Sequence, residues 1–197
     1  EKAPILVRFD PELTVLAKVN YKPGKGMLAV QLSDTTDVIG RLLAVVQQAE
    51  KKDKASVEVL KKVLNEDSFY AVRVAAADGL GKMRSPESFE ALTASLVQTD
   101  ARVRQAVVRG LTRFHSDKAY AALRRVADNE TNPDIRTLAL KALGKYVKPE
   151  LRKYLLVQMK VSSYRHAIAG SAIGAMQSQD DPFYVEPLLR ELQRSEA

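Results

Sequence analysis

A short pattern occurs three times between residues 67 and 146, and it constrains the fold more than any other feature of the sequence. Each copy has an aliphatic residue followed by an arginine and, six residues after that arginine, a small residue followed by leucine. The arginines, here called the marker arginines, are Arg73, Arg104 and Arg136, which lie 31 and 32 residues apart. A constant period of about 20 to 50 residues is typical of repeat arrays. The sequence therefore predicts consecutive copies of one structural unit.

Each copy contains two runs of apolar residues at helical spacing, separated by a short polar turn. The first run is rich in alanine and glycine, which let helices approach closely, and the second carries larger apolar side chains. A degenerate copy with Arg41 comes first, and a fifth begins near residue 162 with His166 in the marker position. The expected helices span residues 36–50 and 55–65, 69–83 and 86–98, 101–114 and 117–128, 133–146 and 149–160, and 182–194 at the end. The prediction is an all-α stack of about five helix pairs that share a continuous core.

The first 26 residues follow a different pattern. Residues 4–21 alternate apolar and polar side chains around a turn at residues 10–12, which predicts a short β-ribbon. Residues 22–26 contain proline and two glycines and mark a boundary, after which residues 27–33 begin a helical pattern. We therefore divide the chain into a β-segment, 1–26, and a helical solenoid, 27–197. Because a two-stranded ribbon is marginal in water, we expect this segment to be the remnant of a preceding β-sandwich domain.

Composition excludes several classes of protein. The chain has no cysteine, which rules out disulfide scaffolds, thiolate zinc sites and cysteine nucleophiles. It has no apolar run of about 18 residues, so we expect no membrane-spanning helix. The formal net charge is +7, but residues of both signs are mixed throughout the repeats, which favours a solvated surface over one basic binding face.

The marker arginines have two interpretations, a row of anion ligands or a structural ladder. Each lies near the start of an expected helix, where a cation is disfavoured by the helix dipole and needs compensation. An acidic residue lies near each of them in the sequence: Asp67, Asp100 and Asp134. We favour a ladder in which each guanidinium bonds to acidic or carbonyl groups of the adjacent unit.

The repeat pattern resembles HEAT repeats of the phycobilisome-lyase-like kind. Residues 72–81, Val-Arg-Val-Ala-Ala-Ala-Asp-Gly-Leu-Gly, carry the resemblance, which extends over about residues 36–194. It implies an α-solenoid with a right-handed superhelix, and it does not specify a function. A free-standing scaffold for a protein or peptide partner is one function that such a domain would have.

The front of the chain carries a second resemblance. The motifs Val7-Arg8-Phe9-Asp10-Pro11, Val15-Leu16, Gln31-Leu32 and Gly40-Arg41-Leu42-Leu43-Ala44 follow in that order. They resemble the join between the β-sandwich and the C-terminal helical domain in zinc aminopeptidases of the aminopeptidase-N type, especially bacterial members. The resemblance implies a non-catalytic C-terminal portion of a metallopeptidase, which contacts the preceding domains and shapes access to the active site.

No catalytic, cofactor-binding or metal-binding residue is predicted in this chain. The zinc site of the aminopeptidases needs two histidines four residues apart on one helix with glutamates nearby. This chain has two histidines, His115 and His166, which are 51 residues apart. We interpret His115 as an exposed residue at a helix end and expect no cofactor.

Binding of nucleic acid is the remaining alternative, because some DNA glycosylases are built of HEAT-like repeats with a basic concave face. The second helices offer basic candidates for such a face: Lys61, Lys62, Arg124, Arg125, Arg152, Lys153 and Arg190. The expected helix at 86–98 presents Glu87 and Glu90 instead, which interrupts the basic stripe. Tryptophan is absent, and aromatic platforms for stacking bases are not evident. The sequence therefore favours a protein partner.

Overall fold

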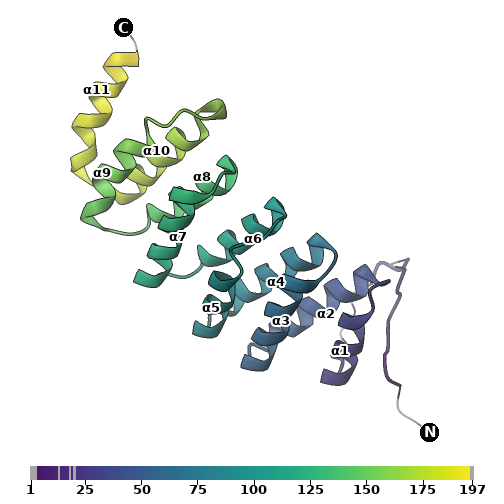
Figure 1. The fold of residues 1–197 in the computed structure, drawn as a ribbon. Helices are drawn as coiled ribbons and strands as arrows, with labels where there is room; N and C mark the ends of the chain where they lie inside the picture. Colours follow the sequence, from purple (N-terminus) through teal and green to yellow (C-terminus); the bar gives the residue numbers. More distant parts are fainter. Residues whose placement is uncertain (1–3, 13, 18, 20, 196–197) are drawn as a thin grey trace. The chain divides into compact units, whose positions relative to one another are not determined.

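The structure is a computed structural model, which describes residues 4–12, 14–17, 19 and 21–195. The chain divides into two compact units, Glu1–Arg113 and Phe114–Ala197. The described part of each is helical (Figure 1). The predicted all-α class is therefore confirmed.

The first unit holds α1 to α6 in two rows. The helices are α1 (Lys25–Ser33), α2 (Val38–Glu50), α3 (Lys54–Glu66), α4 (Tyr70–Met83), α5 (Pro86–Ala94) and α6 (Ala101–Leu111). Helix α4 packs against α2 and α6 in its own row and against α3 and α5 in the other, while α1 packs against α2. The apolar side chains of α4 that face these neighbours, such as Val72 and Leu80, are fully buried.

The second unit continues the alternation of first and second helices. It contains α7 (Asp117–Asn129), α8 (Pro133–Leu143), α9 (Pro149–Gln158), α10 (Ala167–Gln179) and α11 (Val185–Ser195), with short 3₁₀ turns η1 (Tyr164–His166) and η2 (Pro182–Tyr184). Helix α8 packs against α7 and α10, and α10 packs against α9. The first-helix rows are thus α2, α4 and α6 in one unit and α8 and α10 in the other.

Side-chain caps explain where several helices begin. An N-cap side chain satisfies an amide that the first turn of a helix leaves without a partner. Asp53 accepts from the backbone N–H of Ser56, and Ser116 accepts from that of Ala119. Ser85 and Ser88 form a reciprocal capping box around the first turn of α5, which begins at Pro86. These local signals place the starts of α3, α5 and α7 within one residue of the predicted positions.

Glycine is required where the first helices touch. A Cβ on Gly81 of α4 would lie 2.8 Å from the Cα of Gly110 in α6. In the second unit, a Cβ on Gly144 would lie 2.7 Å from the Cα of Ala175 in α10. No real side chain tolerates such distances, so the absence of a Cβ sets the spacing between these helices. This is the close approach that the small-residue pattern predicted.

The predicted β-ribbon is wrong for the described residues. Residues 4–12, 14–17, 19 and 21–24 contain no strand, while residues 13, 18 and 20 of the predicted ribbon lie outside the described residues. A turn does form: Asp10 has a φ of 43°, and its carboxylate accepts from the N–H groups of Thr14 and Val15. The alternating runs before and after this turn are not joined by backbone hydrogen bonds between described residues. The physical reason is that a ribbon of two short strands gains too few contacts to form alone.

The first helix begins close to the position where the helical pattern of the sequence starts. Helix α1 begins at Lys25, two residues before the expected position. In the part of the chain that the structure describes, no helix has the length and apolar character needed to cross a membrane.

Candidate functional site

The degenerate first repeat contains the most enclosed ion pair of the described residues. The side chain of Arg41 in α2 is 2% exposed, and that of Asp67, at the end of α3, is 8% exposed. Arg41 Nε donates to Asp67 Oδ2 at 2.9 Å, and its Nη1 donates to the carbonyl oxygen of Asp34 at 2.7 Å. One guanidinium therefore connects the turn before α2 to the turn after α3.

The marker arginines are engaged mainly by backbone carbonyl groups. Arg104 Nη1 donates to the carbonyl oxygens of Gln98 and Thr99 at 2.8 and 3.0 Å, in the connection before α6. Arg136 Nε donates to the carbonyl oxygen of Ala127 in α7, and its Nη2 donates to Gln158 Oε1 in α9, both at 3.1 Å. Each of these two guanidinium groups is therefore hydrogen-bonded to groups of neighbouring helices and turns.

Arg73 differs from the other marker arginines. Its Nε is buried without a hydrogen-bond partner among the described residues. Its charge lies near Asp100, whose pKa is lowered to about 2, chiefly by hydrogen bonds from Arg102 and in smaller part by the charge of Arg73. Arg73 therefore acts on Asp100 through space, without the bidentate contact that Arg41 makes with Asp67.

A separate set of ion pairs joins neighbouring repeats, and the sequence analysis missed it. The partners lie about one repeat apart in the chain: Lys54–Glu87 at 2.9 Å, Arg109–Asp78 at 3.1 Å, Lys148–Asp117 at 2.7 Å and Arg152–Asp181 at 2.7 Å. A search for opposite charges separated by about one period would have found them. Because these pairs are largely exposed, each contributes little to stability by itself.

The basic candidates on the second helices are not a uniform free surface. Arg124 bonds to Asp128 at 3.1 Å, and its guanidinium lies 3.4 Å from the centre of the Tyr154 ring. Lys62 and Arg190 face acidic residues one turn away, Glu66 at 3.9 Å and Glu186 at 2.9 Å. This pairing reduces the positive field that these residues would present to a phosphate backbone.

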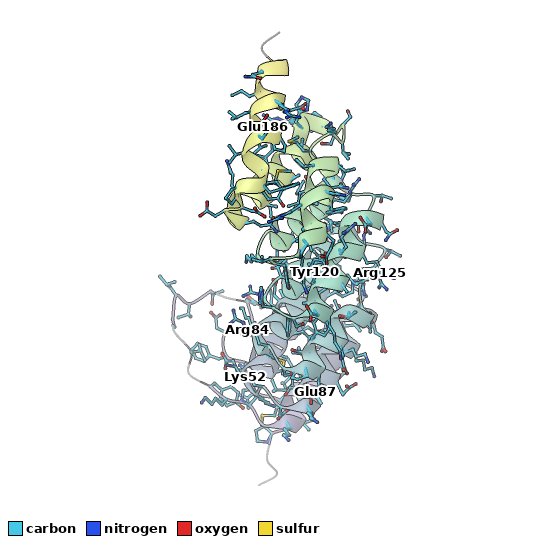
Figure 2. The ribbon with its side chains drawn as sticks, turned by 90° about the vertical axis from the view of Figure 1, so that its left-hand side faces the viewer. Lys52, Arg84, Glu87, Tyr120, Arg125 and Glu186 are labelled. Carbon is cyan, nitrogen blue, oxygen red and sulfur yellow. The ribbon has the colours of Figure 1, made fainter. Side chains whose placement is uncertain are left out.

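The remaining basic candidates are Lys61, Arg125 and Lys153. None of them forms an ion pair with another described residue. Figure 2 shows Arg125 at the surface of the second unit. These three side chains lie on different helices, α3, α7 and α9, and no single turn brings them together.

The two histidines lie in unrelated environments. His115 is exposed and stacks on the ring of Tyr146, with a centroid distance of 4.5 Å. His166 ends η1 with a φ of 53° and is also exposed. Among the described residues, no group of three histidine, cysteine, aspartate or glutamate side chains is arranged to hold a metal ion.

The N-terminal segment and the first two helices line an open, mainly apolar cavity of about 300 Å³. The odd-numbered side chains of the segment line it: Val7, Phe9, Val15, Ala17, Val19 and Tyr21. Leu43 of α2 forms part of the opposite wall, together with Gln31 and Gln47. Arg8 and Asp10 of the same segment also line the pocket, so its lining does not follow a strict alternation.

Arg8 attaches this segment to α2. Its Nη1 lies 3.1 Å from Asp37 Oδ2, and a Cβ on Gly40 would collide with both side chains. Gly40 therefore leaves the space in which the guanidinium lies over the first turn of α2. Arg8 Nε and Gln47 Oε1, both in the cavity wall, are buried without hydrogen-bond partners among the described residues. A tertiary contact over 29 positions gives no local signal in the sequence.

Apolar side chains on α2 extend this surface. Ile39, Leu43 and Val46 follow one another at helical spacing and are 37%, 43% and 53% exposed. In the adjoining segment, Ile5 is 80% and Phe9 is 55% exposed. We call this combined surface, formed by residues 5–9 and the outer face of α2, the N-terminal apolar face. Exposed apolar side chains that gather in one place mark interaction sites more often than single exposed ones.

Comparison with family models identifies the class of this protein. Residues 27–107 and 96–174 match the model of HEAT repeats, which covers most of the chain. The chain belongs to the HEAT-repeat family. No curated protein sequence matches it, and no comparison links it to the aminopeptidase-N family.

Proposed function

We propose that this chain is a non-catalytic HEAT-repeat scaffold that binds a protein partner. The observation that carries the proposal is the N-terminal apolar face, because it exposes apolar side chains from two adjoining elements of a repeat domain. The polar side chains that the sequence singled out support the same function, since most of them are engaged by groups of the protein itself.

Site-specific photo-crosslinking tests this function. A photoreactive phenylalanine analogue replaces Leu43 on the N-terminal apolar face or, as a control of similar exposure, Val157 on α9. In extracts of the source organism, we expect one saturable adduct from position 43 that unlabelled chain competes away, and none from position 157. Equal labelling from both positions, or labelling that unlabelled chain does not reduce, would show non-specific adhesion and contradict the proposal.

In its finer form, the proposal is that the chain is the C-terminal portion of an aminopeptidase-N-like zinc metallopeptidase. The motifs at residues 7–11 and 40–44 support it by resemblance, and Arg8 and Gly40 of those motifs meet at Asp37. In that setting the repeats restrict which peptides reach an active site held by preceding domains. A full reading frame that encodes the two-histidine zinc motif upstream is the expected result, and an upstream region without it contradicts this form.

The isolated chain should lack peptidase activity. With added zinc we expect no hydrolysis of aminoacyl reporter substrates, since the described residues offer no metal-ligand cluster. A mobility-shift assay at two salt concentrations tests the nucleic-acid alternative in the same preparation. Binding to phosphates falls steeply with salt, so a shift at low salt that disappears at high salt would revive that alternative.

A further inference from the structure

The turns that join the first helix of each repeat to its second helix gather basic side chains in the first unit. Exposed basic residues lie at or beside these turns: Lys25 at the start of α1, Lys52 between α2 and α3, Lys82 and Arg84 at the end of α4, and Arg113 after α6. None of these side chains forms an ion pair with another described residue. We call this surface the basic turn edge. Basic residues that are scattered along the sequence are therefore gathered at one edge of the unit.

Contacts between neighbouring repeats join the turns into one surface. The pKa of Asp53, the N-cap of α3, is lowered mainly by hydrogen bonds from Ser56 and in smaller part by the charge of Lys25. The start of α1 therefore lies near the turn before α3. Lys54 Nζ lies 2.9 Å from Glu87 Oε1, which connects that turn to the first turn of α5. The acids at these turns are thus already engaged by groups of the chain.

Two of the cations occupy the same unusual backbone position. Lys52 and Arg84 both have a φ of 53°, and each directly precedes the N-cap residue of a second helix, Asp53 or Ser85. Glycine adopts this left-handed conformation freely, whereas a residue with a Cβ does so at a cost. Figure 2 shows both residues on one side of the first unit. Since glycine would serve the turn better, what these positions add is the charged side chain.

The end of α4 holds several cations close together. A Cβ on Gly81 would lie 3.2 Å from Cδ of Arg113, so Arg113 lies beside the end of α4, where Lys82 and Arg84 follow Gly81. Glu50 is exposed at the end of α2 and belongs to the neighbouring turn. Like charges that the fold holds together repel one another and attract anions jointly. An anionic ligand along this edge therefore interacts favourably with all of them.

We propose that the basic turn edge binds an extended segment of a partner protein that carries an acidic side chain at about every third residue. This inference rests on the proposed protein-binding function and names the chemistry of the partner. Neighbouring helix axes are about 8 to 10 Å apart, and an extended chain rises about 3.3 Å per residue, so such acids match successive turns. Neutral residues between them pass Glu87, which the continuous charge of a nucleic acid backbone would meet.

Fluorescence anisotropy with the full 197-residue chain tests the proposal. The probe is a labelled ten-residue peptide with glutamate at every third position and serine elsewhere, and its matched control has the same composition with the glutamates consecutive. At low salt we expect the spaced peptide to bind at least tenfold more tightly than the control. Equal affinity, or tighter binding of the control, would show attraction to net charge alone and overturn the proposal.

Glycine variants separate binding from folding. Lys52→Gly combined with Arg84→Gly removes two charges and relieves two left-handed positions. We expect this double variant to weaken binding of the spaced peptide at least tenfold while its urea midpoint is kept or raised. The control, Lys61→Gln combined with Lys153→Gln, removes as much charge from helix faces and should weaken binding less than threefold. Equal weakening by the two double variants would contradict the proposed site.

A second double variant, Lys82→Gln with Arg113→Gln, repeats the test without changing backbone freedom and should weaken binding to a similar extent. Single-stranded oligonucleotide and anionic phospholipid vesicles serve as competing probes. If either binds more tightly than the spaced peptide and is weakened by the same variants, the occupant is of another class and the proposal is wrong. If the cross-link at position 43 persists while neither peptide binds, the acidic segment fails and the scaffold function survives.

Discussion

The helical repeats and the N-terminal segment differ in their backbone hydrogen bonds and in how far they bury apolar side chains. Helix α4 satisfies its own backbone and buries Val72 and Leu80 completely against neighbouring helices. The segment of residues 4–9 forms no backbone hydrogen bond with the backbone of another described residue, and Phe9 is more than half exposed. The difference teaches that a repeat is completed by the next repeat of the same chain, while the segment leaves much of its apolar surface exposed.

Two arginine–aspartate pairs show this contrast, and breaking the buried pair gives the largest expected loss of stability. Asp67→Ala leaves Arg41 buried without its partner, which should cost about 3 to 5 kcal/mol of unfolding free energy. Asp37→Ala removes the more exposed partner of Arg8 and a helix N-cap, and should cost about 1 to 2 kcal/mol. Urea unfolding followed by circular dichroism measures both. Equal losses would mean that the segment is as firmly integrated as the repeats.

Two leucines allow the same comparison for apolar burial. Leu80→Ala opens a cavity in α4, where the side chain is fully buried, and should cost about 2 to 5 kcal/mol. Leu16→Ala in the N-terminal segment changes a fully exposed side chain and should stay within about 0.5 kcal/mol. Thermal and urea unfolding report the difference, and a large loss from Leu16→Ala would contradict the open character of the segment.

Two glycines of the second unit test whether close contact sets the spacing of α8 and α10. Gly144→Ala forces a Cβ against the backbone of Ala175 and should cost about 1 to 3 kcal/mol. Gly170→Ala in α10 meets no atom within 4 Å and should stabilise by up to about 1 kcal/mol, because alanine favours a helix. Opposite signs in unfolding free energy are expected. If both variants are stabilised, close contact does not set the spacing of α8 and α10.

Acid should lower the stability of the repeats more than that of the segment. This is the smallest effect among these predictions. The pKa of Asp100 is lowered from 3.8 to about 2, so its contribution to stability is present above about pH 4 and is lost as pH falls toward 2. The pKa values of Asp117 and Asp181 are lowered by hydrogen bonds from Lys148 and Arg152, and act in the same direction. The urea midpoint should fall across this window.

Two matched aspartate-to-asparagine variants show which carboxylate causes the acid dependence of stability. Asp100→Asn should make the fall in the urea midpoint shallower, because the unfolded chain then has one fewer carboxylate that gains protons ahead of the folded chain. Asp10 also has a lowered pKa, owing to hydrogen bonds from Val15 and Thr14, but its turn caps no helix. Because its lowered pKa also makes stability fall with acid, Asp10→Asn should change the profile in the same direction but less than Asp100→Asn, whose pKa shift is the larger, and the opposite order would reverse the comparison.

The sequence predicted the helices well because their signals are local. Caps such as Ser85 and Ser116 and the helical spacing of apolar residues act within one or two turns. The ribbon was predicted wrongly because alternation reports a shared side-chain face and says nothing of the backbone's partner. Val7, Phe9, Val15 and Tyr21 line one pocket with residues of α1 and α2, but Arg8 and Asp10 line it as well.

The contacts that define the site were beyond sequence reasoning. Arg8, Asp37 and Gly40 meet only after the segment has folded against α2. Likewise, many acids could pair with Lys54, and the stacking of repeats selects Glu87. The marker arginines were assigned to a ladder from their spacing, yet their partners, mainly carbonyl groups, depend on the conformation of the turns.

Hydrogen exchange of the isolated chain, without any peptide, tests the central claim most directly. The claim is that the repeats are complete by themselves and that the N-terminal segment is not. Amides of α4 should exchange only through global unfolding, at least a thousandfold more slowly than an unstructured peptide, while those of residues 6–9 should exchange within about tenfold of the unstructured rate. Protection of residues 6–9 that is comparable to that of α4, in a monomeric sample, would contradict the claim.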